Sequence, residues 1–183
     1  MQQTDLSAYN NFPFNPGGNP LKRFLWFYIN ALFLKTSLLP INGFKVMLLR
    51  LFGAKIGSKV TIKPGVNVKY PWHLTIGHDT WIGENVWIDC LVPVTIGNNV
   101  CVSQGALLLT GNHNYKIKSF DLITREVVLE DGVWIGAQAI VNPGVVAATH
   151  AMLTSGSVAN KNLEAYSIYQ GNPATKIRQR III

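Results

Sequence analysis

From residue 56 onward, aliphatic side chains recur at every sixth position of this chain. The recurrence runs in four phases, and its members are Ile56, Ile62, Val68 and Leu74; Ile76, Ile82, Ile88 and Val94; Ile96, Val102 and Leu108; and Leu129, Ile135, Val141, Ala147 and Leu153. A small or β-branched residue follows most of them by four positions, and a glycine often follows directly, as in Ile76-Gly77. A fixed internal period indicates a repeat architecture, so it constrains the fold more strongly than local propensity does.

A period of six fits neither an amphipathic helix nor a plain alternating strand. It fits a triangular prism in which three short strands form one coil and successive coils stack as parallel strands about 4.8 Å apart. The aliphatic residue points inward, and the small residue lies inside near the corner, where a larger one would overpack. Residues 56–73, 76–93 and 96–113 each supply three sides, and the count resumes at 129. The sequence therefore predicts an all-β parallel β-helix of about five coils.

The region before the repeats has a different composition. Between Leu6 and His78 there is no Asp or Glu but nine of the 16 basic residues, so this region carries the net charge of +7. Apolar runs at 24–34 and 44–52 flank Pro40, and the first is too short to span a bilayer. We expect two amphipathic helices. Two compatible roles are open for them: capping the open end of the prism, or anchoring the protein to anionic lipid.

The six-residue rhythm breaks once, between His113 and Leu129. An excursion from a regular solenoid is a loop on its flank, and such loops usually serve binding. This one leaves directly after a histidine, whose imidazole titrates near neutral pH, so His113 is the catalytic candidate. The expected organisation is an N-terminal extension over 1–55, a β-helix domain over 56–163 with an extruded loop at 114–128, and a C-terminal tail over 164–183.

The two cysteines and the start of the chain bear on the compartment. Cys90 and Cys101 are too few for a disulfide framework and lack metal-ligand spacing, so we expect packed free thiols. Residues 2–11 are polar, with no basic start and no apolar signal core, which favours a cytoplasmic protein. Nucleic acid is a poor candidate partner, because no recognition motif accompanies the basic residues.

Several motifs resemble those of a known family. The run Leu-Thr-Gly-Asn-His-Asn-Tyr at 109–115 matches the segment around the catalytic histidine of hexapeptide-repeat O-acetyltransferases. Residues 132–137, 141–145 and 171–174, the last reading Gly-Asn-Pro-Ala, match later stretches of the family. The order of parts and the basic, apolar N-terminal segment are most similar to acetyltransferases of colanic-acid and other exopolysaccharide biosynthesis. The resemblance implies a left-handed β-helix, a hand that the usual rule for parallel crossovers does not favour.

The resemblance also implies an activity: direct acetyl transfer from acetyl-CoA to a sugar hydroxyl, with His113 as general base and no metal. Asp89 comes twenty-four residues before His113, which places it on the adjacent coil near the same edge; it either helps at the site or is a solvated side residue. The residues expected to bind acceptor are Asp89, Asn112, Asn114 and Tyr115. The residues expected to bind CoA are Gly136, Ala137, Ser155, Asn160, Lys161 and Arg178.

Family members form homotrimers in which each site lies between two prisms, so the resemblance implies three equivalent sites. This chain departs from the family at Ser155 and Asn160, where Ala and Thr are more usual, and at Asn114, where Asp often stands. The Lys or Arg that usually follows the Gly-Asn-Pro turn is displaced to Lys176. These departures leave individual CoA contacts and the identity of the acceptor open.

Other functions remain as alternatives. The acceptor is either a polysaccharide precursor, lipid-linked or not, or else a small sugar or an antibiotic. A lipid-linked acceptor would agree with peripheral contact at the inner face of the membrane. A γ-type carbonic anhydrase would need zinc held by three convergent histidines, and His73 and His78 lie about two coils, or about 10 Å, from His113. A non-catalytic scaffold is the third alternative, and loss of acetyl-CoA binding would favour it.

Overall fold

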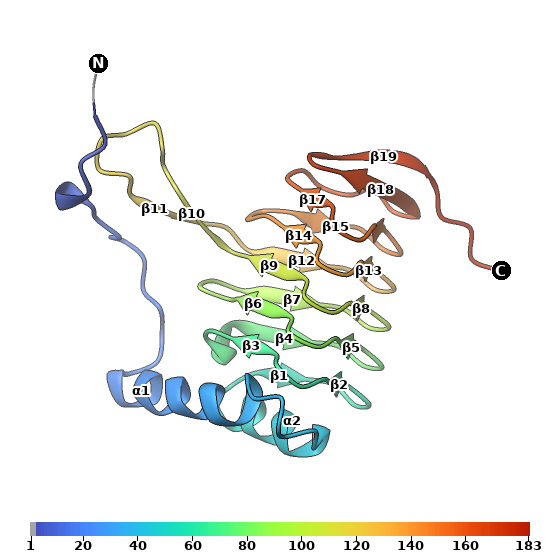
Figure 1. Cartoon of the computed structure of the whole chain (residues 1–183), viewed down its shortest axis with the longest axis horizontal. Helices are drawn as coiled ribbons and strands as arrows, with labels where there is room; N and C mark the ends of the chain where they lie inside the picture. The colour runs from blue at the N-terminus through green and yellow to red at the C-terminus, as the bar shows by residue number, and fades with distance from the viewer. Residues whose placement is uncertain (1–2) are drawn as a thin grey trace.

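A computed structural model describes residues 3–183 and shows a prism of stacked parallel strands with two helices across one end (Figure 1). The strands of the prism form three sheets, one for each side, and a fourth, two-stranded sheet lies outside the prism. Sheet A contains β1 (Lys55–Ile56), β4 (Leu74–Ile76), β7 (Val94–Ile96), β12 (Val127–Leu129) and β15 (Val146–Ala147). Sheet B contains β2 (Thr61–Ile62), β5 (Trp81–Ile82), β8 (Cys101–Val102), β13 (Trp134–Ile135), β16 (Met152–Leu153), β18 (Ser167–Gly171) and β19 (Ala174–Gln179). Sheet C contains β3 (Asn67–Val68), β6 (Trp87–Asp89), β9 (Leu107–Leu109), β14 (Ile140–Val141) and β17 (Val158–Ala159).

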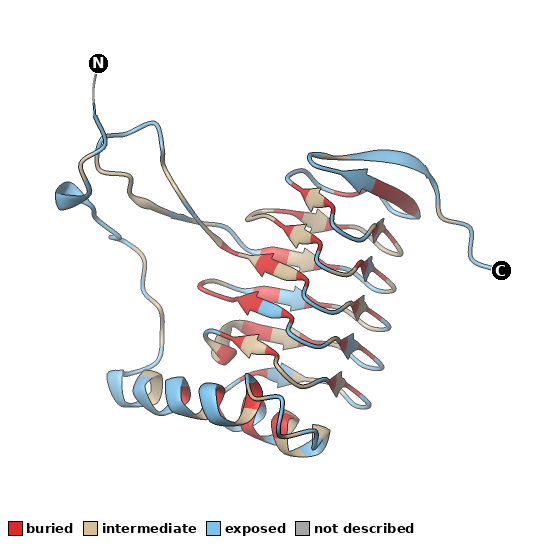
Figure 2. Cartoon of the chain, viewed as in Figure 1, coloured by how far each residue is buried: buried red, intermediate tan, exposed pale blue. Residues whose placement is uncertain are grey.

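The residues of the six-residue period stack on one another in register. In sheet A, Ile76 pairs with Ile56 below and Ile96 above, and Leu129 continues the column. These inward positions form the core that runs along the prism axis (Figure 2). The predicted left-handed parallel β-helix is confirmed.

The prism has five complete coils and two sides of a sixth. Leu163 makes a parallel bridge to Ala147 of sheet A, and β18 pairs in parallel with β16 of sheet B. β19 then folds back on β18 as an antiparallel strand. The stack thus continues into the segment expected to be a C-terminal tail, where the six-residue signal is absent and a hairpin closes the end.

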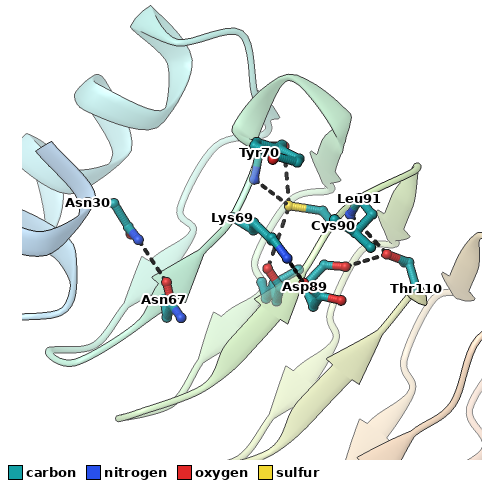
Figure 3. A network of polar contacts seen from close by, with 9 residues as sticks. Asn30, Asn67, Lys69, Tyr70, Asp89, Cys90, Leu91 and Thr110 are labelled. Carbon is teal, nitrogen blue, oxygen red and sulfur yellow. Dashed lines mark hydrogen bonds and ion pairs between the residues drawn. The ribbon is translucent and has the colours of Figure 1, made fainter. Parts of the chain in front are cut away.

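Both cysteines are free thiols, as expected, and Cys90 is buried at the corner that follows β6. Its Sγ atom accepts a hydrogen bond from the Tyr70 amide and donates to the Tyr70 carbonyl (Figure 3). Burial raises the pKa of the Cys90 thiol to about 12. A thiol in this state packs as a small apolar group and is a poor nucleophile.

The N-terminal helices form where the apolar runs predict them. α1 (Pro20–Ile29) begins at an Asn19 cap, whose side chain accepts from the Lys22 amide, with Pro20 in the first turn. It continues as a π-helical turn, η2 (Asn30–Leu34), and α2 (Asn42–Leu51) follows Pro40. None of the helices formed by residues 3–183 has the length and apolar character to cross a membrane.

Side chains of α2 form hydrogen bonds with the backbone groups at the open edge of sheet B. The first coil has no coil below it, so the backbone groups of β2 on that side would otherwise be unpaired. Asn42 donates to the Val60 carbonyl at 2.9 Å and accepts from the Ile62 amide at 2.7 Å. The fully buried Lys45 donates from Nζ to the Ile62 carbonyl at 3.1 Å, and its burial lowers the pKa of the ammonium.

Side chains of the helical segment also form hydrogen bonds with backbone groups at the open edges of the other two sheets. Trp26 Nε1 donates to the Val68 carbonyl at 2.8 Å, and Asn30 Oδ1 accepts from the Val68 amide at 3.3 Å, both on sheet C. Arg50 donates to the Ile56 and Gly57 carbonyls of sheet A, each at 2.8 Å. The helices therefore cap the prism through polar contacts as well as apolar packing.

The break in the rhythm is an antiparallel arm made of β10 (Gly111–His113) and β11 (Leu122–Thr124). The arm starts slightly before the expected loop, 114–128, and the prism resumes with β12 before that range ends. The segment ahead of α1, residues 3–19, runs along the prism and reaches the arm (Figure 1); we call it the N-terminal strap. It is tied there by the Asp5 amide donating to the Lys118 carbonyl and the Asn10 amide to Asp121 Oδ1, both at 2.9 Å.

Candidate active site

His113 ends strand β10 and is half-buried. Its Nδ1 lies 2.9 Å from the carbonyl oxygen of Phe120, and its ring stacks on the Phe120 ring at 4.5 Å between centroids. A carbonyl only accepts hydrogen bonds, so Nδ1 carries the proton in the neutral imidazole and Nε2 carries the lone pair. The contacts of the arm thus fix both the orientation and the tautomer of the His113 imidazole.

The start of the arm, at Thr110 and Gly111, packs against the second coil. Thr110, fully buried, donates its hydroxyl to the Asp89 carbonyl and accepts from the Leu91 amide at 2.9 Å (Figure 3). Gly111 lies so close that a Cβ there would be 2.6 Å from Leu91 Cδ1. A glycine at this point lets the chain leave the prism without displacing Leu91, and His113 follows two residues later.

His113 lines two pockets. The arm pocket, of about 360 Å³, is lined by His113 together with Asn112, Asn114, Tyr115, Lys116, Ile123, Arg125 and Pro143. The Asp89 pocket, of about 380 Å³, is lined by His113 together with Tyr9, Asn11, Phe14, Lys69, Tyr70, Asp89, Leu91, Gly111 and Leu122. Every residue expected to bind acceptor therefore lines a pocket that also includes His113.

Asp89 is buried at the end of β6, directly below Leu109 of the next coil. This is the adjacent-coil position that its spacing from His113 predicts. Its Oδ1 lies 3.2 Å from Lys69 Nζ, although the pair lacks hydrogen-bond geometry and Oδ1 has no hydrogen-bond partner among residues 3–183 (Figure 3). The Lys69 ammonium balances the charge of Asp89, and a hydroxyl donor in the pocket would supply the hydrogen bond that Oδ1 lacks among these residues.

The sequence did not predict the contribution of the N-terminal strap. Tyr9 lies with its ring centroid 5.8 Å from that of His113, and Asn11 and Phe14 line the Asp89 pocket. The strap lies outside the repeat, so no period assigns its residues to a coil. Its aromatic residues were the sole local signal, and they do not reveal which part of the prism the strap reaches.

The residues expected to bind CoA lie at two corners and in the terminal hairpin. Gly136 and Ala137 follow β13, directly below Ser155 at the corner between sheets B and C. A Cβ at Gly136 would collide with the Ser155 amide, and the Gly156 amide donates to the Ala137 carbonyl at 2.8 Å. The close stacking of the next coil therefore requires a glycine at position 136, and the Ala137 carbonyl is paired within the prism.

Asn160 and Lys161 are exposed at the corner that follows β17, on the same edge of the prism as the arm. Arg178 is exposed on β19. None of the six expected CoA residues lines the arm pocket or the Asp89 pocket. Within one chain they are therefore not gathered around His113. Lys176 lies with Nζ 2.6 Å from Glu164 Oε2, so its charge is paired inside the chain.

The remaining histidines contact other parts of the protein. His73 Nε2 lies 3.1 Å from the Pro16 carbonyl, and His78 Nδ1 accepts from the Ser58 amide at 3.1 Å in a corner turn. His150 stacks on Tyr166 at 4.8 Å. Within residues 3–183 there is no group of three or more His, Cys, Asp or Glu that is arranged to hold a metal ion.

A left-handed prism of this kind is the fold of the hexapeptide-repeat acetyltransferases. Comparison with known proteins gives the family. The chain is 35% identical over 177 residues to the protein named colanic acid biosynthesis acetyltransferase WcaF of Escherichia coli K12, with 97% of each covered. It therefore belongs to the WcaF-like hexapeptide-repeat acetyltransferases.

A second relative is similar to the chain in sequence, and a solved structure is similar to it in fold. The galactoside O-acetyltransferase of Escherichia coli K12 is 27% identical over 129 residues, covering 69% of this chain and 64% of the relative. The crystal structure of a hexapeptide-repeat acetyltransferase of Vibrio cholerae complexed with acetyl coenzyme A superposes with a TM-score of 0.79 at 22% identity, covering 88% of each chain. No protein-family model matches the chain.

Proposed function

We propose that this enzyme transfers the acetyl group of acetyl-CoA directly to a carbohydrate hydroxyl, in the synthesis of an exopolysaccharide. The observation that carries the proposal is the fixed tautomer of His113, whose Nδ1 faces the Phe120 carbonyl and whose ring lies between two pockets. The names of two relatives, a colanic acid biosynthesis acetyltransferase and a galactoside O-acetyltransferase, support a sugar acceptor. The Vibrio cholerae structure with acetyl coenzyme A supports the donor.

In this mechanism His113 Nε2 takes the proton of the acceptor hydroxyl as its oxygen attacks the thioester carbonyl carbon. A backbone N–H at the groove stabilises the oxyanion of the tetrahedral intermediate. The intermediate then collapses, the carbon–sulfur bond breaks, and the imidazolium returns its proton to the leaving thiolate. Asp89, Asn112, Asn114 and Tyr115 hold the acceptor through its other hydroxyls. Neither a covalent acetyl-enzyme nor a metal takes part.

Thiol release from acetyl-CoA tests this proposal across free sugars, nucleotide-linked and lipid-linked saccharides, and chloramphenicol as an antibiotic acceptor. We expect release that depends on a carbohydrate acceptor, with the polysaccharide precursors as the fastest. Release with chloramphenicol and with no carbohydrate would replace the proposed acceptor class. Binding of acetyl-CoA without transfer to any acceptor would contradict the proposed reaction.

We also propose a homotrimer in which CoA lies on one subunit, against Gly136, Ala137 and Ser155 and with Asn160, Lys161 and Arg178 toward its phosphates, while the neighbour supplies His113. The separation of these residues from His113 within one chain supports this arrangement.

A mixing experiment tests the shared site. His113→Ala and Ala137→Trp should each be inactive, and refolding the two together should restore activity, because some sites then combine two intact halves. Light scattering must first give three times 20.2 kDa for each variant; a monomer, or no recovery on mixing, refutes the shared site.

Asp89→Asn tests the acceptor side. Asn keeps the shape of Asp89 but removes the charge, so a hydroxyl donor loses a charge-assisted hydrogen bond of about 1.5–3 kcal/mol. We expect the acceptor KM to rise about tenfold or more while the KM for acetyl-CoA stays the same. Asp79→Asn is the matched control, because Asp79 is an exposed corner residue 3.9 Å from Lys59. An unchanged acceptor KM in Asp89→Asn would leave Asp89 as a structural partner of Lys69.

We further propose that the enzyme works at the cytoplasmic face of the membrane and contacts it through α1 and η2. Leu21, Phe24 and Leu32 are 59–64% exposed on this helical segment, and the first 78 residues contain Asp5 as their one acidic residue. An apolar face next to unopposed basic charge is the signature of interfacial binding to anionic lipid.

Co-sedimentation with phosphatidylglycerol-containing vesicles tests the membrane contact. We expect the Leu21→Gln/Phe24→Gln/Leu32→Gln variant to remain in the supernatant while the wild type sediments. Ile181→Gln/Ile182→Gln is the control, since both residues are exposed apolar positions at the other end of the chain. Deleting residues 1–52 is a poor test, because it would also remove the cap of the first coil. Equal sedimentation of the wild type and the triple variant would show that this surface is not the membrane-binding surface.

A further inference from the structure

A third hollow lies between the helical cap and sheet C, outside the site described so far. This basic pocket has a volume of about 380 Å³. Three cationic side chains line it, Arg23, Lys35 and Lys69, and so do four aromatic ones, Trp26, Phe27, Tyr70 and Trp87. Its lining contains no Asp or Glu. A cavity with this composition favours a ligand that carries negative charge beside an apolar group.

The floor of the basic pocket is held by hydrogen bonds between the cap and the first coil. Trp26, which is buried, donates to the Val68 carbonyl, and Asn30 Nδ2 donates to Asn67 Oδ1 at 2.7 Å (Figure 3). These contacts fix η2 against β3 below the opening. The pocket is therefore formed before any ligand arrives, which lowers the entropic cost of binding.

The positive charge of the pocket is only partly compensated. Lys69 pairs with Asp89 at 3.2 Å. Neither Arg23 nor Lys35 has a carboxylate within 4.0 Å in the part of the chain that the structure describes. Two cations thus lack a counter-ion here, one of them a guanidinium suited to paired phosphate oxygens.

The basic pocket adjoins the site at His113. Lys69 and Tyr70 line both the basic pocket and the Asp89 pocket, and His113 lines the latter. On its other side the basic pocket reaches the exposed apolar face of α1, because Phe27 lines it and is 67% exposed. An apolar surface, a cationic cavity and a pocket containing the base therefore follow one another along the same side of the prism.

We propose that the basic pocket binds the diphosphate of a lipid-linked saccharide, with the sugar in the Asp89 pocket and the lipid chain along α1. The inference rests on the proposed function and adds the form of the acceptor and the place of its charged group. A nucleotide sugar shares the diphosphate, and its base would replace the lipid against the aromatic residues. The continuous apolar face of α1 favours the lipid, and the experiment separates the two.

Calorimetric titration of the full-length enzyme with farnesyl diphosphate, below its micellar concentration, tests binding without relying on turnover. We expect farnesyl diphosphate to bind more tightly than farnesol, inorganic diphosphate or UDP-glucose. Arg23→Gln/Lys35→Gln should weaken its binding at least about tenfold, because two charge-assisted contacts are lost. Lys59→Gln/Lys63→Gln, which removes two exposed charges elsewhere on the prism, should leave binding unchanged. Equal binding by the wild type and Arg23→Gln/Lys35→Gln overturns the proposal, and tighter binding of UDP-glucose assigns the pocket to a nucleotide instead.

Turnover provides the second measurement. One saccharide is supplied either free or on an isoprenyl diphosphate, and the ratio of the two kcat/KM values is compared between wild type and Arg23→Gln/Lys35→Gln. We expect the wild type to prefer the linked saccharide and the double variant to lose that preference at least about tenfold. A preference that survives the substitutions overturns the proposal. If farnesyl diphosphate binds through Arg23 and Lys35 but no acceptor yields thiol release, the proposed acetyl transfer fails while the binding site stands.

Discussion

His113→Ala is expected to lower acceptor-dependent kcat/KM by about 10²–10⁴-fold, the range that a positioned general base contributes. The imidazole is held by the Phe120 carbonyl at Nδ1 and by stacking on the Phe120 ring, and alanine removes the Nε2 lone pair that these contacts orient. The measurement is initial-rate thiol release from acetyl-CoA with a saturating acceptor, together with acetyl-CoA binding, which should stay near the wild-type value.

His78→Asn is the matched control for that substitution. His78 accepts from the Ser58 amide, and Asn98 accepts from the His78 amide at the equivalent corner one coil above. An Asn at position 78 therefore has a local precedent and should retain full activity. Turnover by His113→Ala at a rate close to that of His78→Asn would contradict the assigned base, whatever the fold.

Trp26→Ala is expected to lower the free energy of unfolding by about 3–5 kcal/mol, the usual cost of truncating a buried aromatic side chain. Trp26 is 2% exposed, packs against Phe52 at 5.1 Å between ring centroids, and donates to the Val68 carbonyl at the open edge of sheet C. Its loss leaves a cavity and an unpaired carbonyl in the first coil together. Urea unfolding followed by circular dichroism, at one protein concentration, measures the difference.

Trp81→Ala separates this effect from the general loss of an indole. Trp81 lies on β5 and is 61% exposed, so its truncation should cost less than about 1 kcal/mol in the isolated chain. If Trp81→Ala lowered the free energy of unfolding as much as Trp26→Ala, the effect of Trp26→Ala would not come from the contacts of the cap with the first coil.

The six-residue period predicted the fold because it records the inward positions directly. Ile76 and Ile96 share a phase position in the sequence and are direct partners in sheet A. The same count located the arm approximately, since the period stops after His113 and β10 begins at Gly111. It also predicted that Asp89 lies one coil below the arm, because strand pairing preserves the count between neighbouring coils.

The six-residue period could not predict the contacts made by segments that lie outside it. Tyr9 reaches His113 through the N-terminal strap, and Lys45 reaches the Ile62 carbonyl through α2. Both contacts depend on where a non-repeating segment docks, which is decided by packing over the whole molecule. The partial sixth coil was missed for a related reason: β18 pairs with β16 through its backbone, without the aliphatic spacing that marks the earlier coils.

Following the acetyl group itself tests the central claim, direct transfer to a carbohydrate, most directly. The enzyme is incubated with [13C]acetyl-CoA and the best carbohydrate acceptor, and both protein and saccharide are analysed by mass spectrometry during a single turnover. The account predicts one labelled acetyl ester on the saccharide, removable by hydroxylamine, and no label on the protein at any time. Label that accumulates on the protein first, or that never reaches a saccharide, would contradict it.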